Sequence, residues 1–171
     1  LLKLQHHADN ANANPFEEHG IGMTPLMLAL TTLADRNAED STSNAVVQDI
    51  VKMILDHPLC DADVLTQKDN RLRSALGYAT YYDLPNILER MLNHPSCKVE
   101  HLVQEQLHGF DERSILMDAA IAGLNGVAKV ILKNEKCVAE VLKQTNWLGK
   151  SALMYAAEYG NIEIIEMIFQ H

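Results

Sequence analysis

The hexapeptide Ser151-Ala152-Leu153-Met154-Tyr155-Ala156 decides the fold, because its pattern recurs three more times along the chain. The pattern is Ser or Thr, any residue, Leu, any two residues, and then Ala. Its other copies begin at Thr24, Ser74 and Ser114. Such self-similarity is the signature of a repeat architecture, in which each copy forms one supersecondary unit. We therefore expect four copies of one unit.

A second segment follows the hexapeptide in each copy and has apolar residues at helical spacing. Its last large apolar residue stands at one fixed distance beyond each Ser: Leu92, Leu132 and Phe169. The run Ile50-Val51-Ile54-Leu55 fits the same register in the first copy, which carries additional residues. Each copy is thus expected to hold two helices.

The start of each first helix and the turn after it also follow from repeated residues. A Ser or Thr before a helix accepts a hydrogen bond from an otherwise unpaired backbone N–H, which explains why a small hydroxyl residue recurs there. Gly123 and Gly160 stand at one fixed distance after their Ser. Glycine at that place permits a left-handed turn into the second helix.

The segments that connect the copies repeat as well. One position in them is always Cys, and these residues are Cys60, Cys97 and Cys137. The ranges Val99–Leu107 and Cys137–Leu142 look helical. A short third helix is therefore expected in the connectors.

The first copy carries a polar insertion near residues 35–44. We expect a surface loop there, in which Ser43 or Asn44 caps the helix that follows. A contact with a specific partner is the alternative reading of this insertion.

Composition and charge exclude several classes of function. A formal net charge of −9 repels the negatively charged backbone of a nucleic acid. No apolar run is long enough to span a bilayer. Three cysteines at these spacings suit neither a disulfide framework nor a zinc site, which favours a reducing compartment. We therefore expect a soluble, intracellular, cytoplasmic protein with no nucleic-acid partner and no membrane insertion.

No catalytic or metal site is expected either. The sequence lacks the common nucleophile, phosphate-binding and dinucleotide-binding motifs, so we expect neither an enzyme nor a cofactor nor a metal. The cysteines are expected to be buried packing residues in successive layers. His57-Pro58 and His94-Pro95 stand at equivalent helix ends, where a His can interact with terminal carbonyls and a Pro stops the helix. Acidic pairs such as Asp111-Glu112 are assigned to solvated loops.

These residues resemble the ankyrin repeat, whose pattern runs Thr-Pro-Leu-His-x-Ala-Ala, then a Gly near the turn between helices, and then an Ile-Val-x-x-Leu-Leu helix. The resemblance covers nearly all of the chain and is most specific in Asn146–Asn161 and Gly22–Leu26. It implies an all-α, ankyrin-like helical repeat solenoid with long, partly helical connectors.

Two departures from the family pattern change the expected packing. The family's His is replaced by other residues, which are Met27, Gly77, Met117 and Met154. Packing must therefore take over its hydrogen bonds between repeats. The copies are also longer than the roughly 33 residues of the family, and the surplus falls in the connectors.

We expect residues 1–171 to form a single ankyrin-repeat-like domain. Its expected divisions are the end of a preceding repeat (1–19), a repeat with the insertion (20–69), two further repeats (70–108 and 109–145) and a truncated repeat (146–171). Leu1–Leu4 reads as the last turn of a missing helix, and solenoid ends normally need polar caps. The chain is thus expected to be part of a longer protein.

The resemblance also implies where a partner binds, because ankyrin-like proteins use a concave face whose contacts fall at fixed positions of every repeat. Here these positions hold Ile21, Met23, Asn70, Arg71, Arg73, Tyr81, Tyr82, Phe110, Asp111, Arg113, Trp147, Leu148, Lys150, Glu158 and Tyr159. The aromatic residues among them need not be core, and Trp and Tyr are favoured at interfaces. Arg73, Arg113 and Lys150 share one position and form a basic row.

We expect this aromatic and basic strip to bind an acidic, extended or helical segment of another protein, with the chain itself monomeric. Alanine at Trp147 and Tyr82 is expected to weaken that binding. The alternative is that Trp147 and Phe110 fold inward and pack the enlarged connectors.

Three other functions stay open. The chain could be the substrate-recruiting segment of a larger enzyme, or an architectural spacer. Lengthened repeats with insertions are also similar to those of effector proteins that intracellular bacteria deliver into the host cytoplasm. The identity of the partner does not follow from the residues, because a fold does not determine a function.

Overall fold

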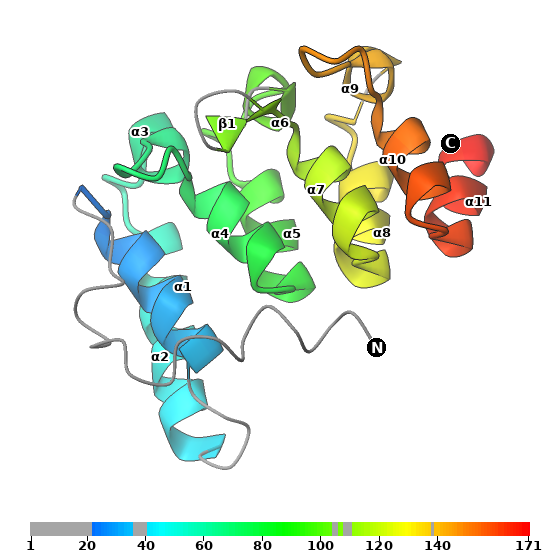
Figure 1. The fold of residues 1–171 in the computed structure, drawn as a ribbon. Coiled ribbons are helices and arrows are strands. Elements are labelled where there is room, and N and C mark those ends of the chain that lie inside the picture. The colour runs from blue at the N-terminus through cyan, green and yellow to red at the C-terminus, as the bar shows by residue number, and fades with distance from the viewer. Residues whose placement is uncertain (1–21, 36–40, 104–105, 108–110, 138) are drawn as a thin grey trace.

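The computed structural model describes residues 22–35, 41–103, 106–107, 111–137 and 139–171, and Figure 1 shows helix pairs stacked side by side. The first helices of the pairs are α1 (Pro25–Asp35), α4 (Ala75–Tyr81), α7 (Ile115–Ala122) and α10 (Ala152–Glu158). The second helices are α2 (Ser41–Leu55), α5 (Pro85–Asn93), α8 (Asn125–Lys133) and α11 (Ile162–Gln170). The first helices form one layer and the second helices lie behind them in another. This arrangement confirms the all-α, ankyrin-like solenoid. Leu1–Leu4 lies outside the described residues.

The predicted Ser caps are present in all three copies that carry a Ser. The hydroxyl oxygens of Ser74, Ser114 and Ser151 accept hydrogen bonds from the backbone N–H groups three residues later, at 3.2, 3.3 and 3.3 Å. Thr24 does the same for Met27 at 3.3 Å. Each side chain satisfies a donor at the helix start that has no partner inside the helix.

The turn between the helices of each of the last three pairs contains a left-handed residue, as the sequence predicts for Gly123 and Gly160. Gly123 and Gly160 adopt φ angles of 67° and 71°. In the second copy the equivalent residue is Asp83, which also has a positive φ, of 54°. Asp is one of the few residues with a side chain that tolerates this conformation.

The core consists of one set of equivalent residues per layer. The Leu of the hexapeptide is fully buried in the first three copies, as Leu26, Leu76 and Leu116. The closing Ala is fully buried in the last three, as Ala79, Ala119 and Ala156. A small residue at that position allows neighbouring first helices to approach closely. The copies therefore bury one another's apolar sides in register.

The insertion in the first copy lengthens its two helices, so the prediction of a polar loop that includes residues 41–44 is wrong. Helix α1 has 11 residues and α2 has 15, whereas α10 has 7 and α11 has 9. Helix α2 begins at Ser41, so Ser43 and Asn44 lie within its first turn and do not precede it. A helix can be extended at its end, because each added residue forms a further backbone hydrogen bond and leaves the packed part of the helix unchanged.

The expected third helix is found in each connector, as α3 (Ala62–Thr66), α6 (Glu100–Val103) and α9 (Ala139–Lys143). The predicted helical range of the middle connector is too long. Its last residues form β1 (Gln106–Leu107), which pairs antiparallel with β2 (Asp111–Glu112). The acidic pair assigned to a loop thus belongs to this short hairpin.

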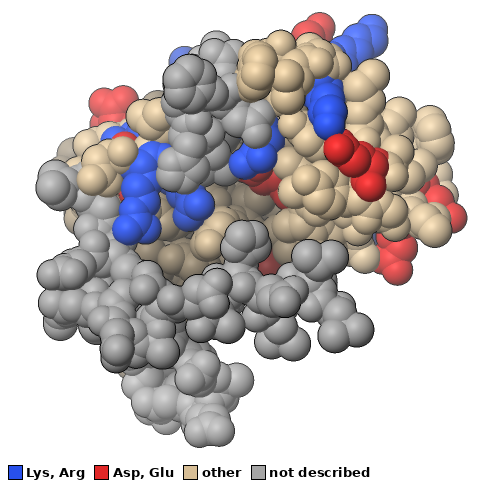
Figure 2. Space-filling view, in the orientation of Figure 1, with Lys and Arg blue, Asp and Glu red and all other residues tan. Residues whose placement is uncertain are grey.

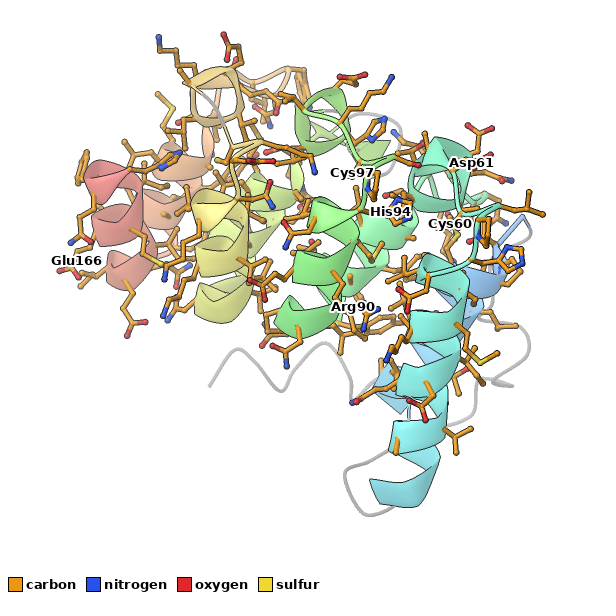
Figure 3. The ribbon with its side chains drawn as sticks, turned by 180° about the vertical axis from the view of Figure 1, so that it is seen from behind. Cys60, Asp61, Arg90, His94, Cys97 and Glu166 are labelled. Carbon is orange, nitrogen blue, oxygen red and sulfur yellow. The ribbon has the colours of Figure 1, made fainter. Side chains whose placement is uncertain are left out.

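The three cysteines are buried and unpaired, as predicted. Figure 3 shows Cys60 and Cys97 at equivalent places in successive repeats. Burial raises the pKa of all three thiols, to about 11 for Cys137.

The two His-Pro histidines have a different local role from the one predicted. The Nδ1 atoms of His57 and His94 accept hydrogen bonds from the backbone N–H groups of Leu59 and Ser96, both at 3.1 Å. The imidazoles therefore organise the turn after the helix and do not bind its terminal carbonyls. They do so because the Pro that follows each His redirects the chain away from the helix axis.

Candidate partner-binding surface

The predicted binding residues that the structure describes lie on the layer of first helices and on the turns that precede those helices. The basic row, Arg73, Arg113 and Lys150, immediately precedes the N-cap residues of α4, α7 and α10. The other residues lie before α1 (Met23), in the preceding turns (Asn70, Arg71, Trp147, Leu148) and at the ends of α4 and α10 (Tyr81, Tyr82, Glu158, Tyr159). Ile21 and Phe110 lie outside the described residues, and Asp111 is part of β2.

One group of these residues forms a packed aromatic cluster around Arg73. The guanidinium carbon of Arg73 lies 4.0 Å from the ring centroid of Tyr81 and 5.7 Å from that of Tyr78. Tyr82 meets Tyr81 edge to face at 5.1 Å and stacks on Tyr78 at 5.9 Å. Tyr81 is nevertheless 51% exposed. We call Arg73, Tyr81 and Tyr82 the Tyr81 patch, which presents a fixed aromatic surface next to a positive charge.

A buried carboxylate, which the sequence analysis missed, holds this patch in place. Asp69 is 3% exposed, and one of its oxygens accepts hydrogen bonds from the backbone N–H groups of Arg71 at 2.9 Å and Arg73 at 3.0 Å. The other oxygen accepts the hydroxyl of Tyr78 at 2.6 Å. Burial and the bond to Asp69 raise the pKa of the Tyr78 phenol, so Tyr78 stays a donor.

Asn146 plays the same part in the last repeat. Its side-chain oxygen accepts hydrogen bonds from the backbone N–H groups of Leu148 at 3.1 Å and Lys150 at 2.9 Å. Its amide donates to the hydroxyl of Tyr155 at 2.8 Å. Asp69 and Asn146 stand equally far before their Ser, with a Tyr equally far after it. That recurrence was the signal available in the sequence, because Asp and Asn side chains organise turns in this way.

The turn fixed by Asn146 displays Trp147 and Leu148. These residues are 63% and 54% exposed, and we call them the Trp147 patch. Gly149 completes the turn with a φ of 72°. The alternative in which Trp147 folds inward is therefore wrong, whereas Phe110 lies outside the described residues. At the other end of α10, Tyr159 is 55% exposed.

The basic row exists, but acidic groups of the same chain already engage two of its members. Arg113 Nε lies 2.9 Å from an Asp118 oxygen, and Lys150 Nζ lies 2.6 Å from a Glu158 oxygen. The hydrogen bond to Glu158 raises the pKa of Lys150. Figure 2 shows the basic side chains of this face in separate spots, one of them against an acidic side chain. Arg73 pairs with no carboxylate within the described part of the chain.

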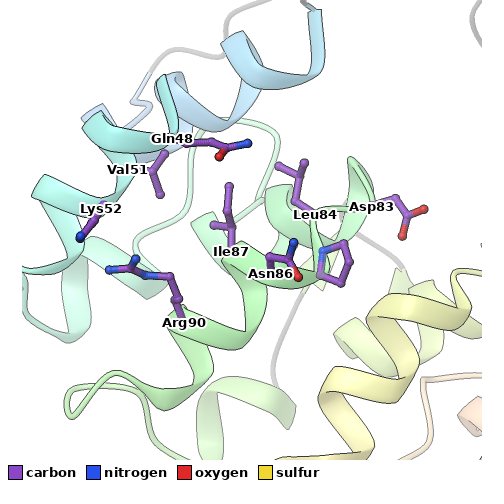
Figure 4. Close-up of a pocket in the computed structure, with 9 residues that line it drawn as sticks. Gln48, Val51, Lys52, Asp83, Leu84, Asn86, Ile87 and Arg90 are labelled. Carbon is purple, nitrogen blue, oxygen red and sulfur yellow. The ribbon is translucent and has the colours of Figure 1, made fainter. Parts of the chain in front are cut away.

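A groove of about 290 Å³ lies on the other layer, between α2 and α5. Figure 4 shows its apolar middle, formed by Val51, Leu84 and Ile87, with Lys52 and Arg90 at one end. Arg90 also bonds Asp56 at 3.0 Å. None of the predicted binding residues lines this groove, so it is separate from the strip.

The described residues show no sign of a metal centre or a membrane span. No three His, Cys, Asp or Glu side chains among them come together in a way that could hold a metal ion. None of their helices is both long and apolar enough to cross a bilayer.

Comparison with known proteins supports the ankyrin resemblance for the second part of the chain. A family model described as ankyrin repeats, in three copies, matches residues 96–171. This range contains α7, α8, α10 and α11 together with the Trp147 patch. No curated protein matches the sequence. The resemblance to bacterial effectors gains no support from these findings and stays a hypothesis.

Proposed function

We propose that this chain is a protein-interaction module that binds a partner through the face formed by its first helices and preceding turns. Ankyrin repeats are generally protein–protein interaction modules and are typically not catalytic. The observation that carries the proposal is the exposure of Trp147, Tyr81 and Tyr159 on that face, each more than half exposed. Exposed aromatic anchors of this kind dominate the energetics of protein interfaces.

The turns beside these anchors, and the Tyr81 ring, are held in place before any partner arrives. Asp69 and Asn146 fix the turns through hydrogen bonds to the backbone, and the edge-to-face contact between Tyr81 and Tyr82 holds these two rings. A side chain that is already ordered loses little conformational entropy on binding, which lowers the free-energy cost of association. Rigid anchors on two repeats that are not neighbours also favour a partner segment long enough to cross the repeat between them.

The chemistry of the Tyr81 patch suits an acidic residue of the partner. Arg73 is the member of the basic row whose side chain forms no ion pair within the described residues, and two rings back its guanidinium. A carboxylate approaching Arg73 would gain a charge-assisted hydrogen bond. Because the net charge of the chain is −9, long-range repulsion disfavours a uniformly acidic partner. The proposed segment therefore carries a local acidic residue among apolar ones.

The test compares affinities of variants for a partner captured from a cell lysate and then purified. The variants are Tyr81→Ala and Trp147→Ala, with Val46→Ala as the control, because Val46 is 54% exposed on the opposite layer. We substitute Tyr81 and not Tyr82, because Tyr82 stacks on the buried Tyr78 and its loss would also disturb the packing of the helix. We expect each patch variant to weaken binding about tenfold or more, as the loss of an aromatic anchor does. Equal affinity of the patch variants and the control would reject this face as the binding site.

Recruitment of a substrate for a larger enzyme would use the same surface. Fusion of the purified partner's binding segment to a reporter, followed by assay with the full-length protein, separates that role from simple binding. Chemical change of the recruited reporter would support recruitment, and binding without change would favour an interaction module.

A further inference from the structure

The layer of second helices has a gap between α2 and α5. Helix α5 packs on α8, and α8 packs on α11. Helices α2 and α5 approach each other less closely, and the groove of about 290 Å³ lies between them. The first helices of the same two pairs, α1 and α4, do pack against each other. The groove therefore lies between two packed repeats, inside the stack.

Two amide side chains explain why α2 and α5 stay apart at this place. Gln48 of α2 and Asn86 of α5 line the groove. Between α5 and α8 the equivalent residues are Pro85 and Gly126, and a Cβ on Gly126 would lie 3.4 Å from Pro85 Cγ. The missing side chain of Gly126 thus lets α8 approach α5. Amides at both positions are larger and polar, so they hold α2 and α5 apart.

The same two amides are available to a peptide backbone. Between α8 and α11 the equivalent residues, Asn125 and Glu163, bond each other. Gln48 and Asn86 are exposed, and neither side chain forms a hydrogen bond within the described residues. A side-chain amide offers a donor and an acceptor, which match the N–H and C=O groups of an extended backbone. A helical segment has no such free groups along its length, because its N–H and C=O groups bond each other.

The middle and the two ends of the groove differ in character. Val51, Leu84 and Ile87 form the apolar middle, as Figure 4 shows. Lys52 lies at one end and Asp83 at the other. Neither of these two charged groups forms an ion pair in the part of the chain that the structure describes. An occupant of complementary charge has an acidic group at one end and a basic group at the other, with apolar side chains between them.

We propose that this groove binds an extended segment of another protein in which an acidic and a basic residue flank a few apolar ones. The acidic residue pairs with Lys52, because Asp56 already bonds Arg90 at the same end. The basic residue pairs with Asp83. The volume of about 290 Å³ is at the lower limit of small-molecule pockets, which hold roughly 300–1,000 Å³, so it suits a few side chains of a peptide. This site goes beyond the proposed function, because it lies on the other layer and uses none of the aromatic anchors.

The experiment titrates the isotope-labelled chain with short blocked peptides and follows its backbone amide resonances by NMR. The probes are Glu-Val-Leu-Val-Lys and Lys-Val-Leu-Val-Glu, which match the charges of the groove with either direction of the backbone. The uncharged control is Gln-Val-Leu-Val-Gln. We expect a charged probe to shift the resonances of Val51 and Ile87. It should bind about fivefold more tightly than the uncharged control, since two exposed ion pairs contribute an effect of that size.

Charge reversal in the chain tests the assigned direction of the segment. Lys52→Glu should weaken binding of the charged probe about fivefold or more. The probe Lys-Val-Leu-Val-Lys should recover binding to this variant, which also shows that the variant is folded. Lys129 is exposed at the equivalent place on α8, so Lys129→Glu changes the net charge equally and should leave binding unchanged. Gln48→Ala and Asn86→Ala should each weaken binding, because each removes a contact with the backbone of the probe.

Several results would overturn the proposal. Unchanged resonances at the groove with both charged probes would exclude a peptide site there. Equal affinity for the charged and uncharged probes would exclude recognition by Lys52 and Asp83. Full affinity in both Gln48→Ala and Asn86→Ala would exclude bonds to an extended backbone. None of these results would affect the binding face on the layer of first helices, which is tested with other variants.

Discussion

Tyr78 donates its phenolic hydroxyl to Asp69 at 2.6 Å and thereby ties helix α4 to the turn that carries Arg71 and Arg73. The bond is buried, and Tyr78 is 1% exposed. Tyr155 and Asn146 form the corresponding bond in the last repeat, at 2.8 Å. In the first bond Tyr78 donates to the carboxylate of Asp69. In the second bond the neutral amide of Asn146 donates to the hydroxyl of Tyr155, so only the first bond involves a carboxylate.

The Tyr78→Phe variant should lose about 1.5–3 kcal/mol of unfolding free energy, because hydrogen bonds to charged groups are worth that much. The matched variant Tyr155→Phe removes a bond between neutral groups and should lose about 0.5–1.5 kcal/mol. Urea unfolding followed by circular dichroism measures both. Equal losses would contradict the stronger bond expected between Tyr78 and Asp69.

The two turn glycines should differ in their sensitivity to alanine. A Cβ on Gly123 would lie 2.7 Å from the side-chain oxygen of Asn161, whereas a Cβ on Gly160 would meet nothing within 4 Å. The left-handed backbone costs a non-glycine residue roughly 1–2 kcal/mol, and this cost alone is expected for Gly160→Ala. Gly123→Ala should be less stable still, because Asn161 must move and weaken its bond to the Ala120 carbonyl at 2.6 Å. Thermal unfolding of both variants gives the comparison, and a more stable Gly123→Ala would contradict the packing of Asn161.

Stability should fall above about pH 9, in part because of Cys137. Burial raises the pKa of its thiol from 9.0 to about 11 in the folded chain. Between these values the unfolded chain has lost the thiol proton and the folded chain has kept it, so rising pH favours unfolding. The Cys137→Ala variant should show a smaller decrease between pH 9 and pH 11 when unfolding is measured in urea. An identical decrease in both proteins would mean that Cys137 is not buried.

The same cysteines should react slowly with a thiol reagent at neutral pH. All three are buried and their pKa values are raised, so little thiolate is present in the folded chain. We expect the reaction to become fast on addition of urea, at the concentration at which the helices unfold. Rapid modification of a cysteine before unfolding would show that its connector opens independently.

The repeated residues predicted the fold well because each has a local physical reason that holds in every copy. Ser74, Ser114 and Ser151 had to cap helices, and Gly123 had to turn the chain. The loop prediction for the insertion of the first copy was wrong at residues 41–44, because a polar composition also suits the exposed surface of a longer helix. A run of polar residues does not by itself distinguish a loop from the solvent-facing turns of a helix.

The sequence predicted the row that Arg73, Arg113 and Lys150 form along the repeats but not their ion pairs, and partner binding at these residues stays a prediction. The positions of the family pattern place Arg73, Arg113 and Lys150 in one row. Asp118 forms an ion pair with Arg113, and Glu158 forms one with Lys150, which reduces the positive charge of the row. A sequence shows where a cation stands, whereas its neutralisation depends on side chains from the following helix. The turn-forming role of Asp69 could have been recognised from the repeated Asx and Tyr spacing.

Direct contact between the exposed aromatic positions and a partner is the central claim, and site-specific photo-crosslinking measures it. A photoreactive amino acid is placed at position 147 in one variant and at position 46 in another, and both are incubated with the purified partner. We predict a crosslinked product from position 147 and none from position 46. A product from position 46, with none from position 147, would contradict the assignment of the binding surface.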